Sequence, residues 1–360
     1  MGKIRVLVID DSAYNRRTIS RVLEELPEVE VAGYAGDGAE GLRQALSLKP
    51  DLITLDLEMP TMEGFTFLRL LMHRCPTPVI VVSSRGDGDR VIQALELGAV
   101  DCVLKPSGVA SSSLADMGDD LRRKVREFFT PDLSGIAGRQ TAPGLPPQSG
   151  ERLVGDDVHP VDVIAIGAST GGPAALKSIL TAFAVRPPLA VLVAQHMPSC
   201  FTRAFAERLD RLSRFEVREA ADGLEVVPGR VLIAPGGQHM TLERRGETVV
   251  AKLRAPDPGD RYLPSVDLLF GAGAEFFASR LMGIVLTGMG NDGAAGVLAI
   301  RRGGGQVIAE SEETAIVFGM PREAIATGLV NKVVRLDQMA YEIALRGGLS
   351  METRQGVSGS

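Results

Sequence analysis

Residues 161–172 read VDVIAIGASTGG, an apolar run that ends in a turn of small residues. The run predicts a buried strand and the apolar segment after Pro173 predicts a helix, which is the strand–turn–helix order of a parallel α/β sheet. Gly167, Ser169 and Gly171 satisfy G-x-S-x-G, a pattern that presents a serine hydroxyl at a helix N-terminus, so Ser169 is a candidate nucleophile. Glycine-rich turns also bind phosphates and dinucleotides, and the motif alone leaves both interpretations open.

Further apolar runs follow in the C-terminal half, among them LAVLVAQ, VLIAP and LMGIVLTG, and several precede helical segments. This alternation predicts a doubly wound, mainly parallel α/β domain, which we place at residues 160–348. The polar residues 349–360 are predicted to form a disordered tail.

The N-terminal part shows the same alternation, with β-branched runs at residues 6–9, 30–34, 52–55, 79–82 and 102–104. Five strands with helices between them predict a flavodoxin-like domain with a five-stranded parallel sheet, at residues 1–125. Residues 126–159 are rich in Pro, Gly, Ser and Gln, which predicts a flexible linker between the two domains.

The composition excludes several classes of partner. The 360 residues carry a net charge of -6, no Trp and 4% aromatic residues, so nucleic acid and anionic lipid are not expected to bind. The cysteines, Cys75, Cys102 and Cys200, form no CxxC pair and are expected to be reduced thiols. Without a signal-peptide pattern or a membrane-spanning apolar run, we expect a cytoplasmic protein.

Polar residues follow four of the five N-terminal strands: Asp10 and Asp11, then Asp56, Ser83 and Lys105. Each alone is more often a solvated loop residue, but the carboxyl ends of parallel strands meet at one edge of a sheet. Clustered carboxylates suit Mg²⁺, so we predict a Mg²⁺ site at the three aspartates. Asp56 would accept a phosphoryl group whose oxygens contact Ser83 and Lys105.

His196 follows the run LAVLVAQ, and Asp292 lies in the turn after LMGIVLTG. A lone histidine is more often a surface or packing residue, and an aspartate beside glycine often only shapes a turn. Because Ser169, His196 and Asp292 all follow strands of one expected sheet, we interpret them as nucleophile, base and orienting acid of a cofactor-free hydrolase. Backbone amides of Thr170 and Met289 are candidate oxyanion donors.

His239 and Asp267 are an alternative base and acid. Neither directly ends a long apolar strand, so we expect structural or substrate-groove roles for them. The chain order Ser, His, Asp also differs from that of α/β-hydrolases, which argues against that fold.

The segments DLEMP at 56–60 and LKP at 104–106, with the acidic pair at 10–11, resemble the response-regulator receiver family. The resemblance implies phosphorylation of Asp56. Cys102 departs from the family at the position of its mobile aromatic residue. Mg²⁺ binding and phosphoryl contacts are implied for the other residues of this edge: Asp10, Asp11, Ser83 and Lys105.

Six C-terminal segments resemble the chemotaxis methylesterase (CheB) family: GASTGG, QHMP, APGGQHM, PSVDLLF, LTGMGNDG and FGMP. The resemblance implies that Ser169, His196 and Asp292 are the triad and that the Met289 amide is an oxyanion donor. It further implies hydrolysis of γ-methyl glutamate esters on chemoreceptors and deamidation of selected glutamines. Cys200 departs from the family, which usually has glycine there.

We therefore expect a phosphorylation-activated esterase that acts as a monomer on chemoreceptors and receives its phosphoryl group from a chemotaxis histidine kinase. The unphosphorylated receiver should cover the esterase edge, and phosphorylation should loosen that contact. One alternative is a phospho-switched nucleotide- or protein-binding module. A transcriptional output protein is the other, but no helix-turn-helix pattern or basic face supports it.

Overall fold

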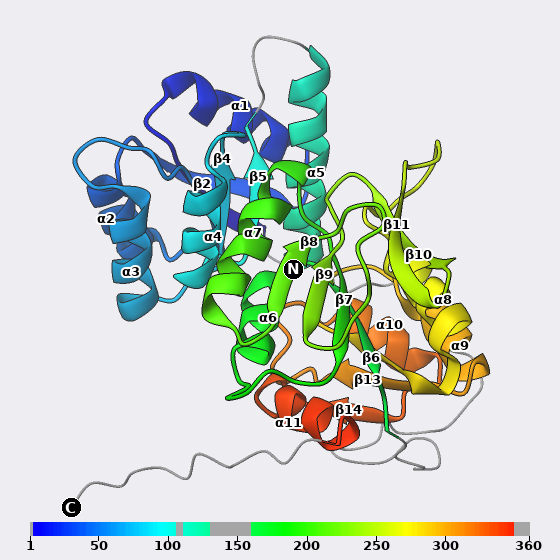
Figure 1. Cartoon of the computed structure of the whole chain (residues 1–360). Coiled ribbons are helices and arrows are strands. Elements are labelled where there is room, and N and C mark those ends of the chain that lie inside the picture. The colour runs from blue at the N-terminus through cyan, green and yellow to red at the C-terminus, as the bar shows by residue number, and fades with distance from the viewer. Residues whose placement is uncertain (1–2, 106–110, 130–159, 349–360) are drawn as a thin grey trace, which may run out of the picture.

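The computed structural model describes residues 3–105, 111–129 and 160–348, which form two α/β domains packed against each other (Figure 1). Residues 126–129 continue helix α5 (Ser111–Phe129) past the predicted domain boundary at 125. The rest of the predicted linker and the predicted tail lie outside the described residues. Among the described helices, none combines the length and apolar character needed to cross a membrane.

The N-terminal domain is a five-stranded parallel sheet in the order β2-β1-β3-β4-β5, which confirms the predicted receiver fold. Its strands are β1 (Ile4–Ile9), β2 (Val29–Ala35), β3 (Leu52–Leu55), β4 (Val79–Ser83) and β5 (Asp101–Leu104). The helices that alternate with them are α1 (Ala13–Glu24), α2 (Gly38–Leu48), α3 (Gly64–Arg74), α4 (Gly88–Glu96) and α5.

Both faces of this sheet are covered, which explains the continuous apolar runs in its strands. Val6 and Val8 belong to the cluster that includes buried residues of α1 and α5. Leu7 and Ile9 belong to the opposite cluster, with residues of α2, α3 and α4. Strands that are buried on both faces are therefore mostly apolar along their length, with few polar side chains such as Thr54 of β3.

The C-terminal domain has a seven-stranded parallel sheet in the order β14-β13-β12-β6-β7-β9-β8, and a separate antiparallel hairpin, β10-β11. The strands are β6 (Val163–Ala168), β7 (Ala190–Gln195), β8 (Glu216–Glu219), β9 (Arg230–Ile233), β10 (His239–Arg245), β11 (Thr248–Arg254), β12 (Leu281–Val285), β13 (Gln306–Glu310) and β14 (Lys332–Val334). The helices are α6 (Gly172–Leu180), α7 (Ser199–Leu212), α8 (Val266–Phe277), α9 (Ala294–Arg302), α10 (Met320–Ala326) and α11 (Leu336–Arg346).

Helices cover both faces of the C-terminal sheet, as the sequence predicts. Residues of α6, α7 and α11 pack on one face, and residues of α8, α9 and α10 with the hairpin pack on the other. Strands β12, β6 and β7 are neighbours in the middle of the sheet. Their carboxyl ends therefore bring three loops together at one edge, where ligands bind in open α/β sheets.

The two domains meet where α4 of the receiver packs beside α6 and α7 (Figure 1). Glu96 of α4 accepts two hydrogen bonds from Arg208 of α7, at 2.9 and 2.8 Å, and lies 3.5 Å from Lys177 of α6. The hydrogen bond from Arg208 is the main reason that the pKa of Glu96 is lowered. A cavity of about 270 Å³ remains between the three helices.

Candidate active site

Ser169 begins the turn that follows β6, and its side chain is only 3% exposed. The Ser169 amide donates a hydrogen bond to the carbonyl of Thr287 at 3.0 Å. A Cβ atom at Gly288 would lie 2.7 Å from the Cβ of Ser169, so the loop after β12 approaches the serine closely. Gly171 has a φ of +81°, a left-handed conformation that glycine adopts without strain. The small residues of the motif thus allow one loop to pack on another at the nucleophile.

His196 lies beside Ser169 because β6 and β7 pair in parallel with Ala168 opposite Gln195. The Nε2 of His196 lies 2.9 Å from Oδ2 of Asp292, so the predicted base and acid are in contact. Among the described residues, no hydrogen bond joins the Ser169 hydroxyl to the imidazole. Because Nε2 is engaged by Asp292, Nδ1 is the ring nitrogen that remains for the serine.

Asp292 is 2% exposed, and its carboxylate is held by the first residues of α8. It accepts hydrogen bonds from the amides of Val266 at 2.7 Å and Asp267 at 2.9 Å, and from the hydroxyl of Ser265 at 3.2 Å. Burial tends to raise the pKa of Asp292, but the hydrogen bond and charge of His196 and the two amides hold it below its ordinary value. An ionised carboxylate in this position can fix the imidazole tautomer and stabilise the imidazolium.

The alternative pair, His239 and Asp267, makes structural contacts. His239 is fully buried, with Nε2 2.8 Å from a carboxylate oxygen of Asp260 and Nδ1 accepting from the amide of Ser265 at 3.0 Å. Asp267 accepts from the amide of Gly293 at 2.9 Å, next to the start of α9. Both nitrogens of His239 are engaged in holding the loop that precedes α8, and Asp267 joins two helix ends, so neither is positioned as a free base or acid.

The candidate oxyanion donors lie on two loops that meet at the nucleophile. Thr170 directly follows Ser169 and its side chain is 1% exposed. Met289 lies in the loop after β12, next to Gly288, whose carbonyl accepts from the amide of Met320 at 2.7 Å. The FGMP segment therefore fixes the loop that carries Met289. The oxyanion roles of both amides stay predictions.

Two further residues at this edge were not predicted from the sequence. Tyr262 stacks on His196, with ring centroids 5.2 Å apart and an interplanar angle of 7°. Glu310 is fully buried and accepts from the amide of Thr287 at 2.8 Å. Burial raises the pKa of Glu310, although the hydrogen bonds from Thr287 and Thr314 oppose the rise. Glu310 ends the apolar strand QVIAE, a signal that could have revealed it, whereas Tyr262 lies in a loop without periodicity.

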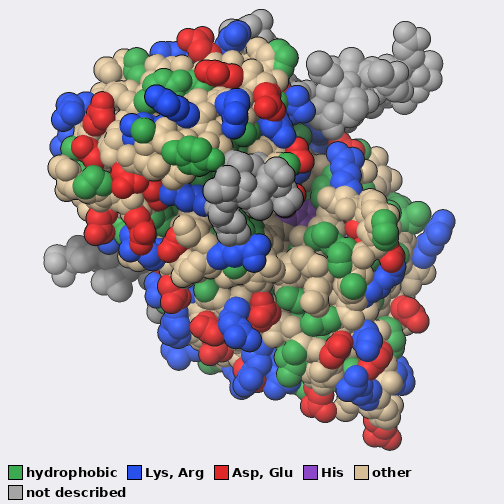
Figure 2. Space-filling model, turned by 90° about the horizontal axis from the view of Figure 1, so that it is seen from above, with side chains coloured by type: hydrophobic (Ala, Val, Ile, Leu, Met, Phe, Trp, Pro, Cys, Tyr) green, Lys and Arg blue, Asp and Glu red, His purple; other side chains and the backbone are tan. Residues whose placement is uncertain are grey.

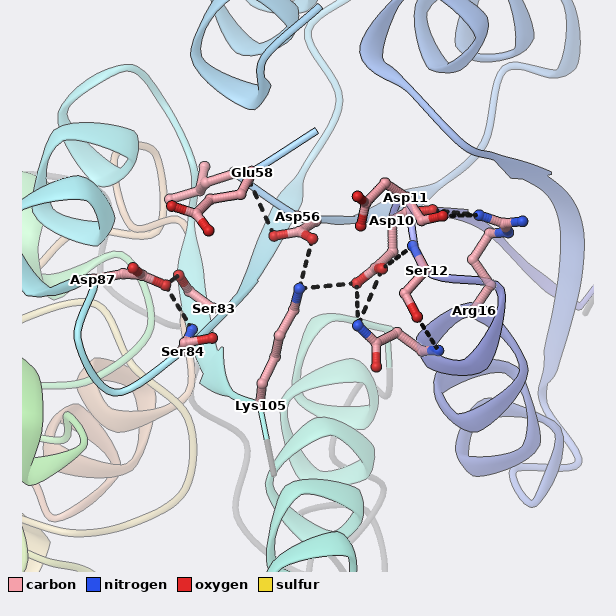
Figure 3. Close-up of polar contacts among 12 residues, drawn as sticks. Asp10, Asp11, Ser12, Arg16, Asp56, Glu58, Ser83, Ser84, Asp87 and Lys105 are labelled. Carbon is pink, nitrogen blue, oxygen red and sulfur yellow. Dashed lines mark hydrogen bonds and ion pairs between the residues drawn. The ribbon is translucent and has the colours of Figure 1, made fainter. Parts of the chain in front are cut away.

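The predicted phosphorylation site forms at the carboxyl edge of the receiver sheet (Figure 3). The Nζ of Lys105 lies 2.5 Å from Oδ2 of Asp56 and 3.1 Å from Oδ2 of Asp10. Carboxylate oxygens of Asp10, Asp11 and Asp56 lie within 4.8 Å of one another, a set of hard oxygen ligands that fits Mg²⁺. Burial raises the pKa of Asp56, since the opposing effect of Lys105 does not fully cancel burial and the Asp10 charge.

Ser83 ends β4 on the same edge, but its hydroxyl donates to Oδ2 of Asp87 at 2.7 Å (Figure 3). The Ser83 hydroxyl, which is predicted to contact the phosphoryl group, is therefore bonded to the following loop and not to Asp56. Cys102 of β5 is 1% exposed, and Lys124 of α5 donates to its carbonyl at 2.6 Å. Burial strongly raises the pKa of the Cys102 thiol, so this residue is a packing group at the position of the family's aromatic switch.

A cleft of about 510 Å³ lies between α5 of the receiver and the loops around His196. Figure 2 shows a histidine side chain at the base of a hollow between two lobes of the surface. Tyr262 and Pro198 line the esterase side of the cleft. The receiver side is lined by charged residues of α5: Asp116, Asp120, Arg123 and Lys124. His196, the predicted base, therefore lies in a cleft that both domains line.

The fold and the site together define a response regulator with a hydrolase domain. Residues 6–114 match the response regulator receiver domain family, and residues 164–343 match the CheB methylesterase family. The chain belongs to the CheB methylesterase family. These matches favour the esterase interpretation over the alternative of a nucleotide- or protein-binding module.

The relatives match over nearly their whole length. A protein-glutamate methylesterase/protein-glutamine glutaminase of Geobacter sulfurreducens is 55% identical, covering 97% of this chain and 99% of its own. A protein of the same name from Myxococcus xanthus is 49% identical, and the match covers 95% of this chain and 97% of the relative. The crystal structure of the CheB methylesterase catalytic domain of Thermotoga maritima is 39% identical and covers 51% of this chain and 97% of its own, with a TM-score of 0.49.

Proposed function

We propose that this chain hydrolyses γ-methyl glutamate esters on chemoreceptors, with release of methanol, and deamidates selected receptor glutamines to glutamate. The relatives at 55% and 49% identity are named for these two activities. Both reactions transfer an acyl group to water, so one site can serve both. The observation that carries the proposal is the hydrogen bond between His196 and Asp292, one strand away from the turn that presents Ser169.

The proposed reaction follows from the groups at this edge. Nδ1 of His196 takes the proton of Ser169, whose Oγ attacks the ester carbonyl, and the amides of Thr170 and Met289 stabilise the oxyanion. The imidazolium then protonates the leaving group as its bond to the acyl carbon breaks, so that an ester releases methanol and a glutamine releases ammonia. Water repeats the cycle on the acyl-enzyme and releases glutamate. Asp292 holds the imidazole tautomer and stabilises its positive charge throughout.

We propose that Asp56 receives the phosphoryl group from a chemotaxis histidine kinase. A Mg²⁺ held by Asp10, Asp11 and Asp56 would neutralise the charge of the phosphoryl oxygens. Lys105 already contacts the Asp56 carboxylate and can hold one of these oxygens. The Ser83 hydroxyl must exchange its present acceptor for the phosphoryl group, which alters the loop before α4.

Regulation in this proposal depends on access to the nucleophile. Ser169 is 3% exposed with the receiver in place, and a receptor polypeptide needs far more access. Phosphorylation shifts the equilibrium only if it changes the receiver surface that contacts α6 and α7, and α4 is part of that surface. We propose that the protein acts as a cytoplasmic monomer and binds no nucleic acid.

Methanol release from methylated receptor membranes tests the proposal. Wild-type protein should release methanol, more so with a small acyl phosphate, and Ser169→Ala should release none. Ser199→Ala is a matched control, because Ser199 is an exposed serine on the rim of the same cleft. Asp56→Asn should keep the unstimulated rate and lose the stimulation. Full activity of Ser169→Ala, or stimulation of Asp56→Asn, would contradict the assigned roles.

A further inference from the structure

Two hydrogen-bond donors in the turn after Ser169 bond to acceptors on the receiver domain. The Thr170 hydroxyl donates to Oδ2 of Asp101 at 2.5 Å, and the Gly171 amide donates to the carbonyl of Val100 at 3.0 Å. Asp101 is the first residue of β5, and Val100 directly precedes it. One short segment of the receiver thus supplies acceptors to the two residues that follow Ser169.

The esterase itself fixes the shape of this turn. The Ser169 amide donates to the Thr287 carbonyl at 3.0 Å, and the Thr170 carbonyl accepts from the Thr287 hydroxyl at 2.9 Å. Neither bond involves the receiver. Departure of the receiver therefore leaves both bonds to Thr287 in place, and it removes the acceptors that Asp101 and Val100 supply to the Thr170 hydroxyl and the Gly171 amide. Donors at a buried site need new acceptors, which water or a bound substrate can supply.

The position of these two donors favours a bound substrate over water as the source of the new acceptors. Asp101 forms an ion pair with Lys124, and both side chains are largely buried. Lys124 also lines the cleft that contains His196. Departure of the receiver removes Lys124 and Asp101 together and opens the space beside Thr170. A polypeptide that brings its ester to Ser169 has to enter this space.

We propose that the Thr170 hydroxyl and the Gly171 amide form a substrate subsite, which binds a carbonyl or carboxylate oxygen of the polypeptide next to the reactive ester. The Val100 carbonyl and the Asp101 carboxylate occupy this subsite as an internal substrate mimic while the receiver is docked. Thr170 is thus a substrate-positioning residue, and the receiver competes with the substrate for specific donors as well as covering the site. The inference rests on the proposed esterase function.

The test uses the full chain with a saturating small acyl phosphate, so that the receiver contact is released. Methanol release is measured against the concentration of methylated receptor membranes for wild type, Thr170→Val and Thr170→Ser. Loss of one hydrogen bond to the substrate should raise the KM of Thr170→Val about fivefold, while kcat falls by less. Thr170→Ser retains a hydroxyl and should restore the KM towards the wild-type value.

Binding provides a measure that does not need turnover. In a Ser169→Ala background with the acyl phosphate, Thr170→Val should reduce co-sedimentation with methylated receptor membranes, whereas Thr170→Ser should not. Asp101→Asn should raise the unstimulated methanol release, because it weakens the hydrogen bond between the receiver and the Thr170 hydroxyl and leaves Thr170 and Gly171 unchanged.

Two results would overturn the inference. In the first, Thr170→Val has the wild-type KM and binding with the acyl phosphate and differs only in its unstimulated rate, so the hydroxyl serves the domain contact alone. In the second, Thr170→Ser shows the same defect as Thr170→Val, so retention of the hydroxyl does not restore binding and the hydroxyl is not the group that binds the substrate. Failure of the esterase function is distinguishable, since wild type would then release no methanol at all.

Discussion

Replacement of Asp292 by Asn tests the most specific feature of the active site. The carboxylate accepts from Nε2 of His196 at 2.9 Å and from two amides of α8 at 2.7 and 2.9 Å. An asparagine side chain has one acceptor oxygen and one donor nitrogen. The Val266 amide donates to the same oxygen, Oδ2, that contacts Nε2, whereas the Asp267 amide donates to Oδ1. If the asparagine oxygen takes the Oδ1 position, the nitrogen faces Nε2 and favours the tautomer in which Nδ1 carries the proton. That tautomer cannot accept the proton of Ser169.

The loss of the correct tautomer should lower kcat about 10³- to 10⁴-fold, as in serine hydrolases whose orienting aspartate is changed. This factor corresponds to about 4–5.5 kcal/mol of transition-state stabilisation. The exchange of charge-assisted for neutral hydrogen bonds at α8 should also lower the free energy of unfolding by about 1–3 kcal/mol. Activity therefore falls much more than stability.

Methanol release from methylated receptor membranes, with thermal unfolding in parallel, measures both effects. Asp267→Asn is a matched control, because it changes the neighbouring carboxylate but keeps an acceptor oxygen for Gly293. The control should lose some stability and keep most of its activity. A kcat for Asp292→Asn within tenfold of wild type, in protein that remains folded, would refute the assignment of Asp292 as the orienting acid.

Three further predictions concern neighbouring contacts. Tyr262→Ala removes the ring stacked on His196 and should lower kcat about three- to tenfold, whereas Tyr262→Phe should retain the rate of the stimulated wild type. Glu310 has a pKa raised above its unfolded value of 4.5, so folding stability should decline as pH rises from 4.5 through the folded pKa. Glu310→Gln should lack this decline, and denaturant unfolding at several pH values will detect the difference. Arg208→Ala removes two hydrogen bonds to Glu96 across the domain contact and should raise the unstimulated esterase rate about two- to fivefold.

Each of these has a contrary outcome. Equal losses in Tyr262→Ala and Tyr262→Phe would show that the phenolic hydroxyl matters more than the stacking. A parallel pH dependence of stability for Glu310→Gln and wild type would mean that this carboxyl ionises without cost. Arg211→Ala, a change of an exposed arginine on the same helix, is the control for Arg208→Ala, and an equal rise in both would exclude a specific domain contact.

Many residues of the two candidate sites could be predicted because the carboxyl ends of parallel strands lie at the same edge of a sheet. Apolar runs that are buried on both faces stand out in the sequence, and the residue after each run lies at the functional edge. That rule identifies Asp56 and Lys105 in the receiver and Ser169 and His196 in the esterase. The motif also indicates where the backbone needs a glycine, since Gly171 has a left-handed conformation.

Contacts between loops could not be predicted in the same way. Nothing in the spacing of residues indicates that Tyr262 stacks on His196, that Ser83 is held by Asp87, or that Thr170 bonds to the receiver. These contacts depend on how separate loops and domains pack, and packing follows from side-chain shape across long sequence separations. The sequence by itself therefore determined the two α/β domains and the residues at their edges. Only the tertiary structure decided which partners those residues contact, because hydrogen bonds and stacking require positions that no local pattern encodes.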